Sequence, residues 1–187
     1  MVMAYSKENF LVGLRKVVVA QMTGTPAAVV YGTTYQLEVA NMYTVTAEPI
    51  TDRLEGDDKR AALYSAIVGG TIHIEFAFKS LAAVAALMNG TLTDSGTYQQ
   101  LSQDNTPMKY FGINGEIVDQ DATMSADLWV PVCKIMGNVG FPVQYGKYWR
   151  QTFDAQFIEC TDSRYPYFYD ILEHAAVTPP TIPPTYS

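Results

Sequence analysis

The sequence has few of the residues from which metal and catalytic sites are usually built. It contains two histidines and two cysteines in 187 residues, and the cysteines do not form a CxxC pair. Structural zinc sites take four closely spaced Cys or His ligands, so a zinc site is not expected. The sequence also lacks the Walker A, G-x-G-x-x-G, H-E-x-x-H and G-x-S-x-G motifs. We therefore expect a protein that is not an enzyme and that needs no cofactor.

Positive charge is scarce as well. Twelve Lys and Arg stand against 19 Asp and Glu, which gives a net charge of -7. A chain of this charge repels phosphate backbones, so sequence-specific binding of nucleic acid is not expected. Residues 1–21 lack the long apolar core of a signal peptide, and no run of the chain approaches membrane-spanning length. Cys133 and Cys160 lie in strand-like segments and would permit one disulfide, but in a protein made in the cytoplasm we expect them to be buried free thiols.

Hydrophobic and aromatic residues are abundant. They include 13 Tyr and 8 Phe, and hydrophobic residues make up 48% of the chain. This composition predicts a folded domain with a real core, and we expect a single domain over residues 1–177. The end of the chain, TPPTIPPTYS over 178–187, is expected to be a proline-rich extended arm, because proline cannot donate to a sheet.

Most of the chain shows the alternation of apolar and polar residues that is typical of β-strands. Residues 37–46 are expected to form a strand that Pro49 ends, and residues 61–68 an apolar segment that turns at Gly69 and Gly70. Further strands are expected over 108–118, 126–136, 151–161 and 165–174. The strand over 126–136 is apolar on both faces, which predicts that it is covered on both sides, with Pro131 at an edge or a bulge.

Residues 71–90 change from strand to helical periodicity without a linker. The buried face of the strand is expected to be Ile72, Ile74, Phe76 and Phe78, and the apolar stripe of a helix over about 80–89 is expected to be Leu81, Val84, Leu87 and Met88. Ser80 can cap this helix and Gly90 can supply the left-handed residue that ends it. His73 and Glu75 share the polar face of the strand, where they could hold a metal, but no further ligand is spaced to join them.

A strongly charged segment covers residues 51–60. Its acidic residues gather around Gly56, but they do not follow the spacing of an EF-hand calcium loop. We interpret the segment as an exposed loop or hairpin tip, either solvated or in contact with another subunit. The polar segment 91–107 is expected to be a long loop and a possible contact surface.

Aromatic residues gather over residues 165–169. They could form a stacking platform for sugars or bases. Aromatic residues in a strand more often fill a core or a subunit interface, and we favour that interpretation.

These segments predict a mainly β protein. We expect about seven or eight antiparallel strands in a sandwich or barrel, with one flanking α-helix that closes an open end or flank.

The order of the segments resembles one known family. The segments are VGLRKVVVAQ (12–21), LEVANMYTV (37–45), the run from LEGDDKR to ALMNG (54–90), TPMKYFGING (106–115), LWVPVCKIMG (128–137) and FDAQFIECT (153–161). In this succession the chain resembles the major tail tube protein of long-tailed (siphovirus-type) bacteriophages. The resemblance implies a β-sandwich or barrel with one flanking helix, six copies of which close into a ring. Stacked rings would form the hollow tube through which the genome passes.

The resemblance also implies partners and contact residues. The partners would be further copies of the chain, the tape measure, tail tip and terminator proteins, and DNA in transient, non-specific passage, with no membrane. The expected location is the tail of the virion, after synthesis in the bacterial cytoplasm. The expected subunit contacts are Glu48, Asp52, Arg53, Glu55, Asp57, Asp58, Lys59 and Arg60. The alternatives are another phage β-sandwich subunit, such as a tail terminator or a capsid decoration protein, and a carbohydrate-binding β-sandwich.

Overall fold

The computed structural model describes residues 11–37, 40–56, 59–77, 81–119, 121, 123–140 and 150–184, without the side chains of 11, 12, 51–65, 137 and 138. These residues form ten strands and one helix. The elements are β1 (Leu11–Met22), β2 (Tyr31–Leu37), β3 (Ala40–Gly56), β4 (Lys59–Ala77), α1 (Leu81–Met88), β5 (Thr91–Asp94), β6 (Gln99–Ser102), β7 (Phe111–Asp119), β8 (Ser125–Gly140), β9 (Arg150–Phe157) and β10 (Asp170–His174). The expectation of a mainly β, antiparallel protein with one helix is confirmed.

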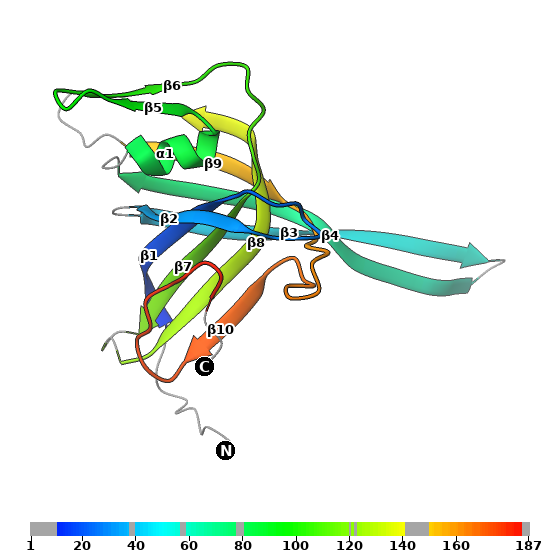
Figure 1. Cartoon of the computed structure of the whole chain (residues 1–187). Helices are drawn as coiled ribbons and strands as arrows, with labels where there is room; N and C mark the ends of the chain where they lie inside the picture. The colour runs from blue at the N-terminus through cyan, green and yellow to red at the C-terminus, as the bar shows by residue number, and fades with distance from the viewer. Residues whose placement is uncertain are drawn as a thin grey trace.

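One large antiparallel sheet carries most of the strands (Figure 1). Its order is β2-β1-β7-β8-β9-β4-β3, and β10 adds to β8 beside this path. The first part of β8 pairs with β7 and β10, and its last part pairs with β9 from Cys133 to Gly140. The long strand β8 therefore joins the two halves of the sheet.

The sheet folds back on itself, because β1 packs against β3 although the two strands are not neighbours in the sheet. Tyr43 of β3 reaches across, and its hydroxyl donates to the carbonyl of Leu128 in β8 at 3.2 Å. The main core lies between the facing halves and includes residues of β1, β2, β4, β7, β8, β9 and α1. This arrangement buries one face of most strands without a second large sheet.

Helix α1 completes the core, as its expected apolar stripe predicts. Val84, Leu87 and Met88 are buried, while Leu81 is only half-buried. The left-handed residue at the end of the helix is Asn89, with φ 54°, and not Gly90 as expected. The N–H of Gly90 instead donates to the carbonyl of Ala85 at 2.9 Å, which is the Schellman arrangement. The expected cap Ser80 lies outside the described residues.

Two expected breaks in the β3 and β4 region are wrong. Pro49 does not end the strand but lies within β3, and Gly69 and Gly70 do not turn the chain but lie within β4. The register shifts between the Glu48 and Gly69 pair and the Pro49 and Ile67 pair, so proline and glycine coincide in one β-bulge. The extra residue is Val68 of β4, and the ladder disrupted by the bulge can accommodate Pro49, which cannot donate a hydrogen bond.

Other segments differ in extent from their prediction. The expected loop 91–107 contains the hairpin of β5 and β6, and the expected strand 165–174 begins only at Asp170. Strand β8 is buried on both faces over Trp129 to Cys133, as its apolar sequence predicts. Pro131 lies in a bulge of β8 opposite β7, as expected. Phe111 pairs with Cys133 and Ile113 with Val130, so one residue of β7 faces two residues of β8 between these pairs.

The described part of the proline-rich end lies on the large sheet. In Figure 1 the segment after β10 crosses β7 and β8 before it reaches the C-terminus. Pro180 and Pro184 are buried, and the amide of Asn114 in β7 donates to the carbonyl of Thr181 at 3.1 Å. Residues 185–187 lie outside the described residues.

Candidate functional site

Strands β3 and β4 extend beyond the rest of the protein as a two-stranded arm (Figure 1). They pair from Ala40 with Phe76 to Gly56 with Lys59. Strand β9 pairs with β4 only from Gly70 to Ala77. Within the described strands, residues 59–69 of β4 therefore pair with β3 alone.

The expected contact residues gather on this arm. Glu48 is exposed at the base of the arm, opposite Gly69. The backbone of Asp52, Arg53, Glu55, Lys59 and Arg60 belongs to the paired strands of the arm, and Asp57 and Asp58 lie outside the described residues. The expected exposed loop or hairpin tip is therefore the end of a long hairpin.

The base of the arm exposes large apolar side chains. Ile50 is 50% exposed, Ile67 39% and Val68 47%. The sequence pattern did not predict their exposure, because Pro49 was expected to end one strand just before Ile50, and residues 61–68 were expected to form a segment that ends at a turn. The pattern that could have predicted this exposure is an apolar run directly beside a charged segment. A contiguous apolar patch on the surface is unusual for a monomer and marks an interaction site.

The outer face of β4 and β9 is polar. His73 Nδ1 lies 2.6 Å from Asp154 Oδ1, and the Arg150 guanidinium donates to Glu75 Oε1 at 2.8 Å. The two residues that could have shared a metal therefore each have a partner on β9. Among the described residues, no group of three or more His, Cys, Asp or Glu side chains is arranged to hold a metal ion.

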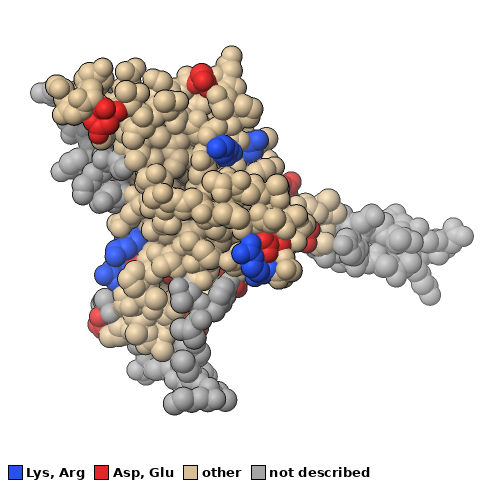
Figure 2. All heavy atoms as spheres, in the orientation of Figure 1, with Lys and Arg blue, Asp and Glu red and all other residues tan. Residues whose placement is uncertain are grey.

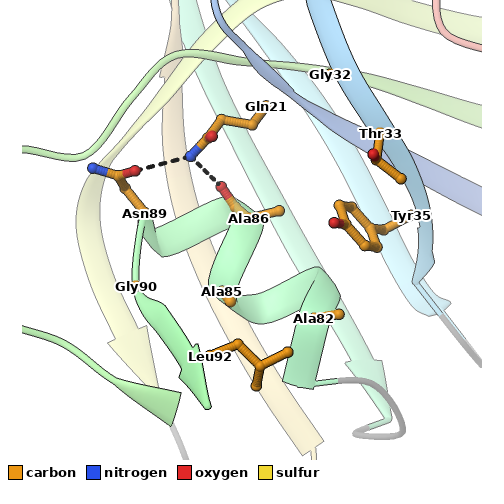
Figure 3. A pocket seen from close by; sticks show the side chains of 10 residues that line it. All are labelled: Gln21, Gly32, Thr33, Tyr35, Ala82, Ala85, Ala86, Asn89, Gly90 and Leu92. Atoms are coloured by element: carbon orange, nitrogen blue, oxygen red, sulfur yellow. Dashed lines mark hydrogen bonds between the residues drawn. The ribbon is translucent and has the colours of Figure 1, made fainter. Parts of the chain in front are cut away.

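A pocket of about 350 Å³ opens between α1 and the start of the sheet (Figure 3). Ala82, Ala85 and Ala86 form its helical wall, and Tyr35 stands opposite. The amide of Gln21 donates to Asn89 Oδ1 at 3.1 Å and to the carbonyl of Ala86 at 3.3 Å. The lining residues carry no charge, and their hydroxyl groups are those of Thr33 and Tyr35.

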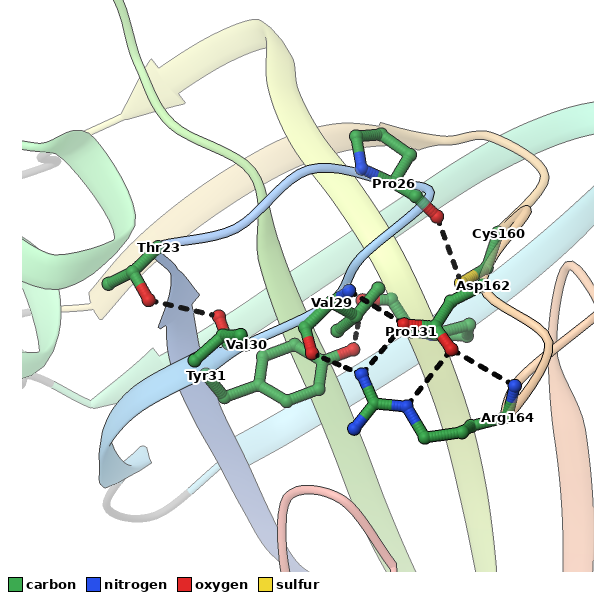
Figure 4. A network of polar contacts seen from close by, with 9 residues as sticks. All are labelled: Thr23, Pro26, Val29, Val30, Tyr31, Pro131, Cys160, Asp162 and Arg164. Atoms are coloured by element: carbon green, nitrogen blue, oxygen red, sulfur yellow. Dashed lines mark hydrogen bonds and ion pairs between the residues drawn. The ribbon is translucent and has the colours of Figure 1, made fainter.

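A buried carboxylate joins two loops on another side of the sheet (Figure 4). Asp162 Oδ2 accepts from the N–H of Val29 at 2.7 Å and from Arg164 Nη2 at 2.7 Å. Arg164 Nη2 also donates to the carbonyl of Val29 at 2.6 Å. The Arg164 guanidinium beside Asp162 holds the pKa of that carboxyl well below its usual range. The pair holds both backbone polar groups of Val29 and is a structural tie, since its charges are already satisfied.

The aromatic residues of 165–169 point into the protein. Tyr165 is 9% exposed and meets Trp129 edge to face with ring centroids 6.5 Å apart. Phe168 and Tyr169 contact the ring of Phe157 in the main core. The favoured interpretation was that these rings fill a core or a subunit interface, and their packing against the core agrees with the first of these.

The two cysteines are buried free thiols, as expected. Burial raises the pKa of the Cys133 thiol, which donates to the carbonyl of Phe111 at 3.0 Å. Burial also raises the pKa of Cys160. Neither thiol has the exposed, electropositive surroundings that activate a nucleophilic cysteine.

The view in Figure 2 shows charged side chains scattered over a mainly uncharged face. The described residues on this face form no basic patch of the kind that holds a phosphate backbone. In the described part of the chain, no helix is long and apolar enough to cross a membrane. No known family model matches the chain, and no curated protein shows significant similarity to it.

Proposed function

We propose that this protein is a structural subunit of the tail tube of a long-tailed bacteriophage. Six copies would form a ring, and the rings would stack into a hollow tube through which DNA passes. The observation that carries this proposal is the arm of β3 and β4. In its outer part these two strands pair with each other, and no other described strand pairs with them.

An isolated two-stranded hairpin is marginally stable in water, so a long one that leaves the body calls for a partner. The arm offers a charged end and an exposed apolar base around Ile50, Ile67 and Val68. This combination of an apolar centre and a polar rim is typical of protein interfaces. A further copy of the chain is the partner that the resemblance to tail tube proteins favours.

The remaining surface is compatible with a tube. The polar face with His73, Glu75 and Asp154 could line a lumen or contact a neighbour. An acidic lumen would repel DNA and let it pass without adhesion, and the chain's net charge of -7 is compatible with such a lumen. The tape measure, tail tip and terminator proteins are the further partners that this function implies.

Negative-stain electron microscopy of the purified full chain tests the proposal. We expect hexameric rings or hollow tubes, whose length would separate a tube protein from a terminator or decoration subunit that closes once and does not stack. A stable monomer at high concentration under all salt conditions would contradict the proposal.

A double charge reversal tests the contact on the arm. Asp57→Lys with Asp58→Lys should slow or abolish assembly and leave the Tm of the subunit nearly unchanged. The matched control is Asp121→Lys with Glu173→Lys, which reverses two exposed charges on the β7–β8 connection and on β10. Equal assembly rates in the two double variants would show that the end of the arm is not a contact.

A further inference from the structure

Buried ionisable side chains lie on the face of the sheet that the C-terminal segment crosses. Glu116 of β7 is 0% exposed, Asp127 of β8 is 2% and His174 of β10 is 7%. Glu116 pairs directly opposite Asp127, and His174 Nε2 lies 3.5 Å from Asp127 Oδ2. Three neighbouring strands thus bring two carboxyl groups and an imidazole together where water has little access.

The cluster has incomplete polar contacts. Within the described part of the chain, Glu116 Oε2, Asp127 Oδ1, His174 Nε2, Asn114 Oδ1 and Trp129 Nε1 are buried without a hydrogen-bond partner. Buried polar atoms without a partner disfavour the closed arrangement, and exposure to water would satisfy them.

Residues 175–184, which we call the strap, cover this face. The N–H of Thr178 donates to Ser125 Oγ at 3.0 Å, Ser125 Oγ donates to the carbonyl of Ala176 at 3.4 Å, and Asn114 Nδ2 donates to the carbonyl of Thr181 at 3.1 Å. The strap follows His174 directly and carries no ionisable side chain of its own. Asn114 also donates to Asp127 Oδ2 at 3.0 Å, so one amide links the strap to the charged cluster.

We propose that the strap is a proton-linked latch, which seats on the sheet when the cluster of Glu116, Asp127 and His174 holds an added proton and loosens when that proton leaves. The charged and titratable groups that face this cluster from neighbouring positions are Arg15 and Lys16 of β1 and Asp170 of β10.

The sign of the linkage follows from Glu116. Burial raises the pKa of the Glu116 carboxyl, Arg15 and Lys16 oppose this rise, and Asp127 adds to it. Arg15 is only a partial counterion, because its guanidinium lies 3.5 Å from Glu116 Oε1 and its side chain is 43% exposed. A group whose pKa is higher in the closed state binds its proton more tightly there. Closure is therefore favoured at low pH, and this contribution is lost as pH rises through the closed-state pKa of Glu116.

Trp129 lies beside an attachment point of the strap, because it is 0% exposed and pairs with Asn114, whose amide donates to the carbonyl of Thr181. The chain has two tryptophans, so Trp149→Phe leaves Trp129 as the only one. We expect acrylamide quenching of Trp129 in the unassembled full chain to rise severalfold between about pH 4.5 and pH 8, the range above the ordinary pKa of a carboxyl group. Quenching that does not change over this range would overturn the proposal.

Glu116→Gln, which imitates the protonated carboxyl, separates the latch from a general loosening of the protein. The variant should keep Trp129 protected across the whole range, while the control Glu173→Gln, at an exposed position of β10, keeps the pH dependence of the parent. A variant at Glu116 that follows the parent profile would contradict the proposal.

Hydrogen exchange provides a second measurement that needs no substitution. In the unmodified protein, the exchange rate of the Thr178 amide, corrected for its intrinsic pH dependence, should increase with pH, while that of the buried Ile113 in β7 stays low. A corrected Thr178 rate that is independent of pH would overturn the latch even if the variant at Glu116 failed to fold.

Discussion

The ring of Tyr43 occupies the space that a side chain on Gly115 would need. A Cβ atom on Gly115 would lie 2.3 Å from Tyr43 Cδ1. The two residues belong to β3 and β7, which lie far apart in the strand order, so their contact marks where the folded halves of the sheet meet. The absence of a side chain at one position lets an aromatic ring close the core at the other.

This contact predicts that Gly115→Ala destabilises the protein. The added methyl group would displace the Tyr43 ring, and overpacking of this kind costs about 1–3 kcal/mol of unfolding free energy. Gly13→Ala is the matched control, because a Cβ there meets no atom within 4 Å. Denaturant unfolding of both variants checks the prediction, and equal losses would show that Tyr43 moves aside freely.

The helix stripe predicts a second loss of stability. Leu87 is 1% exposed in the main core, so Leu87→Ala should lower the unfolding free energy by about 2–5 kcal/mol. Leu81→Ala should cost less, because Leu81 is only half-buried. Urea unfolding measures both losses. If Leu81→Ala lowered the unfolding free energy more than Leu87→Ala does, the buried face of α1 would lie elsewhere.

The clamp of Asp162 predicts a pH-dependent effect. Because the folded-state pKa of Asp162 lies below its unfolded value of about 3.9, the ionised carboxyl stabilises the fold above that pH. This contribution is lost as pH falls through the folded-state pKa. Asp162→Asn should therefore lower the urea midpoint at neutral pH, and the difference from the parent should shrink in acid. Glu159→Gln, at an exposed position of the same loop, should change the urea midpoint little. If the difference in urea midpoint between Asp162→Asn and the parent did not vary with pH, the charge of Asp162 would play no part.

The base of the arm predicts a defect in assembly without a defect in folding. Ile50→Ser with Val68→Ser should prevent rings or tubes, while the unfolding free energy changes by no more than about 0.5 kcal/mol, because both residues are exposed in the subunit. Ile171→Ser on β10 removes an apolar group that is 62% exposed and lies off the arm. Light scattering measures the rate of assembly of each variant. If Ile171→Ser slowed assembly as much as the arm variant does, the arm would have no special role.

Local patterns predicted much of the fold correctly. The alternation of Ile72, Ile74 and Phe76 placed a buried strand face, and the spacing of Val84, Leu87 and Met88 placed the buried face of α1. These predictions succeed because the periods of strand and helix determine which side chains share a face. The apolar run over 126–136 likewise predicted a strand covered on both sides.

Proline and glycine misled where tertiary structure used them differently. Pro49 and Gly69 are typical of chain breaks, yet both lie within paired strands, on the two sides of a register shift at which Glu48 pairs with Gly69 and Pro49 with Ile67. Gly90 is the expected end of α1, yet Asn89 adopts the left-handed conformation, while a Cβ on Gly90 would lie 2.7 Å from Leu101 of β6. Such residues permit several local structures, and only the neighbours select one.

Local patterns in the chain are enough to predict a mainly β protein with one helix and a net charge of -7, because period and composition are local properties. Three features depend on the folded arrangement of the strands: Tyr43 packs on Gly115, the side chains of Glu116, Asp127 and His174 meet beneath residues 175–184, and the apolar base of the arm stays exposed. These relationships join strands that lie far apart in the chain, and no local pattern specifies the pairing of distant strands.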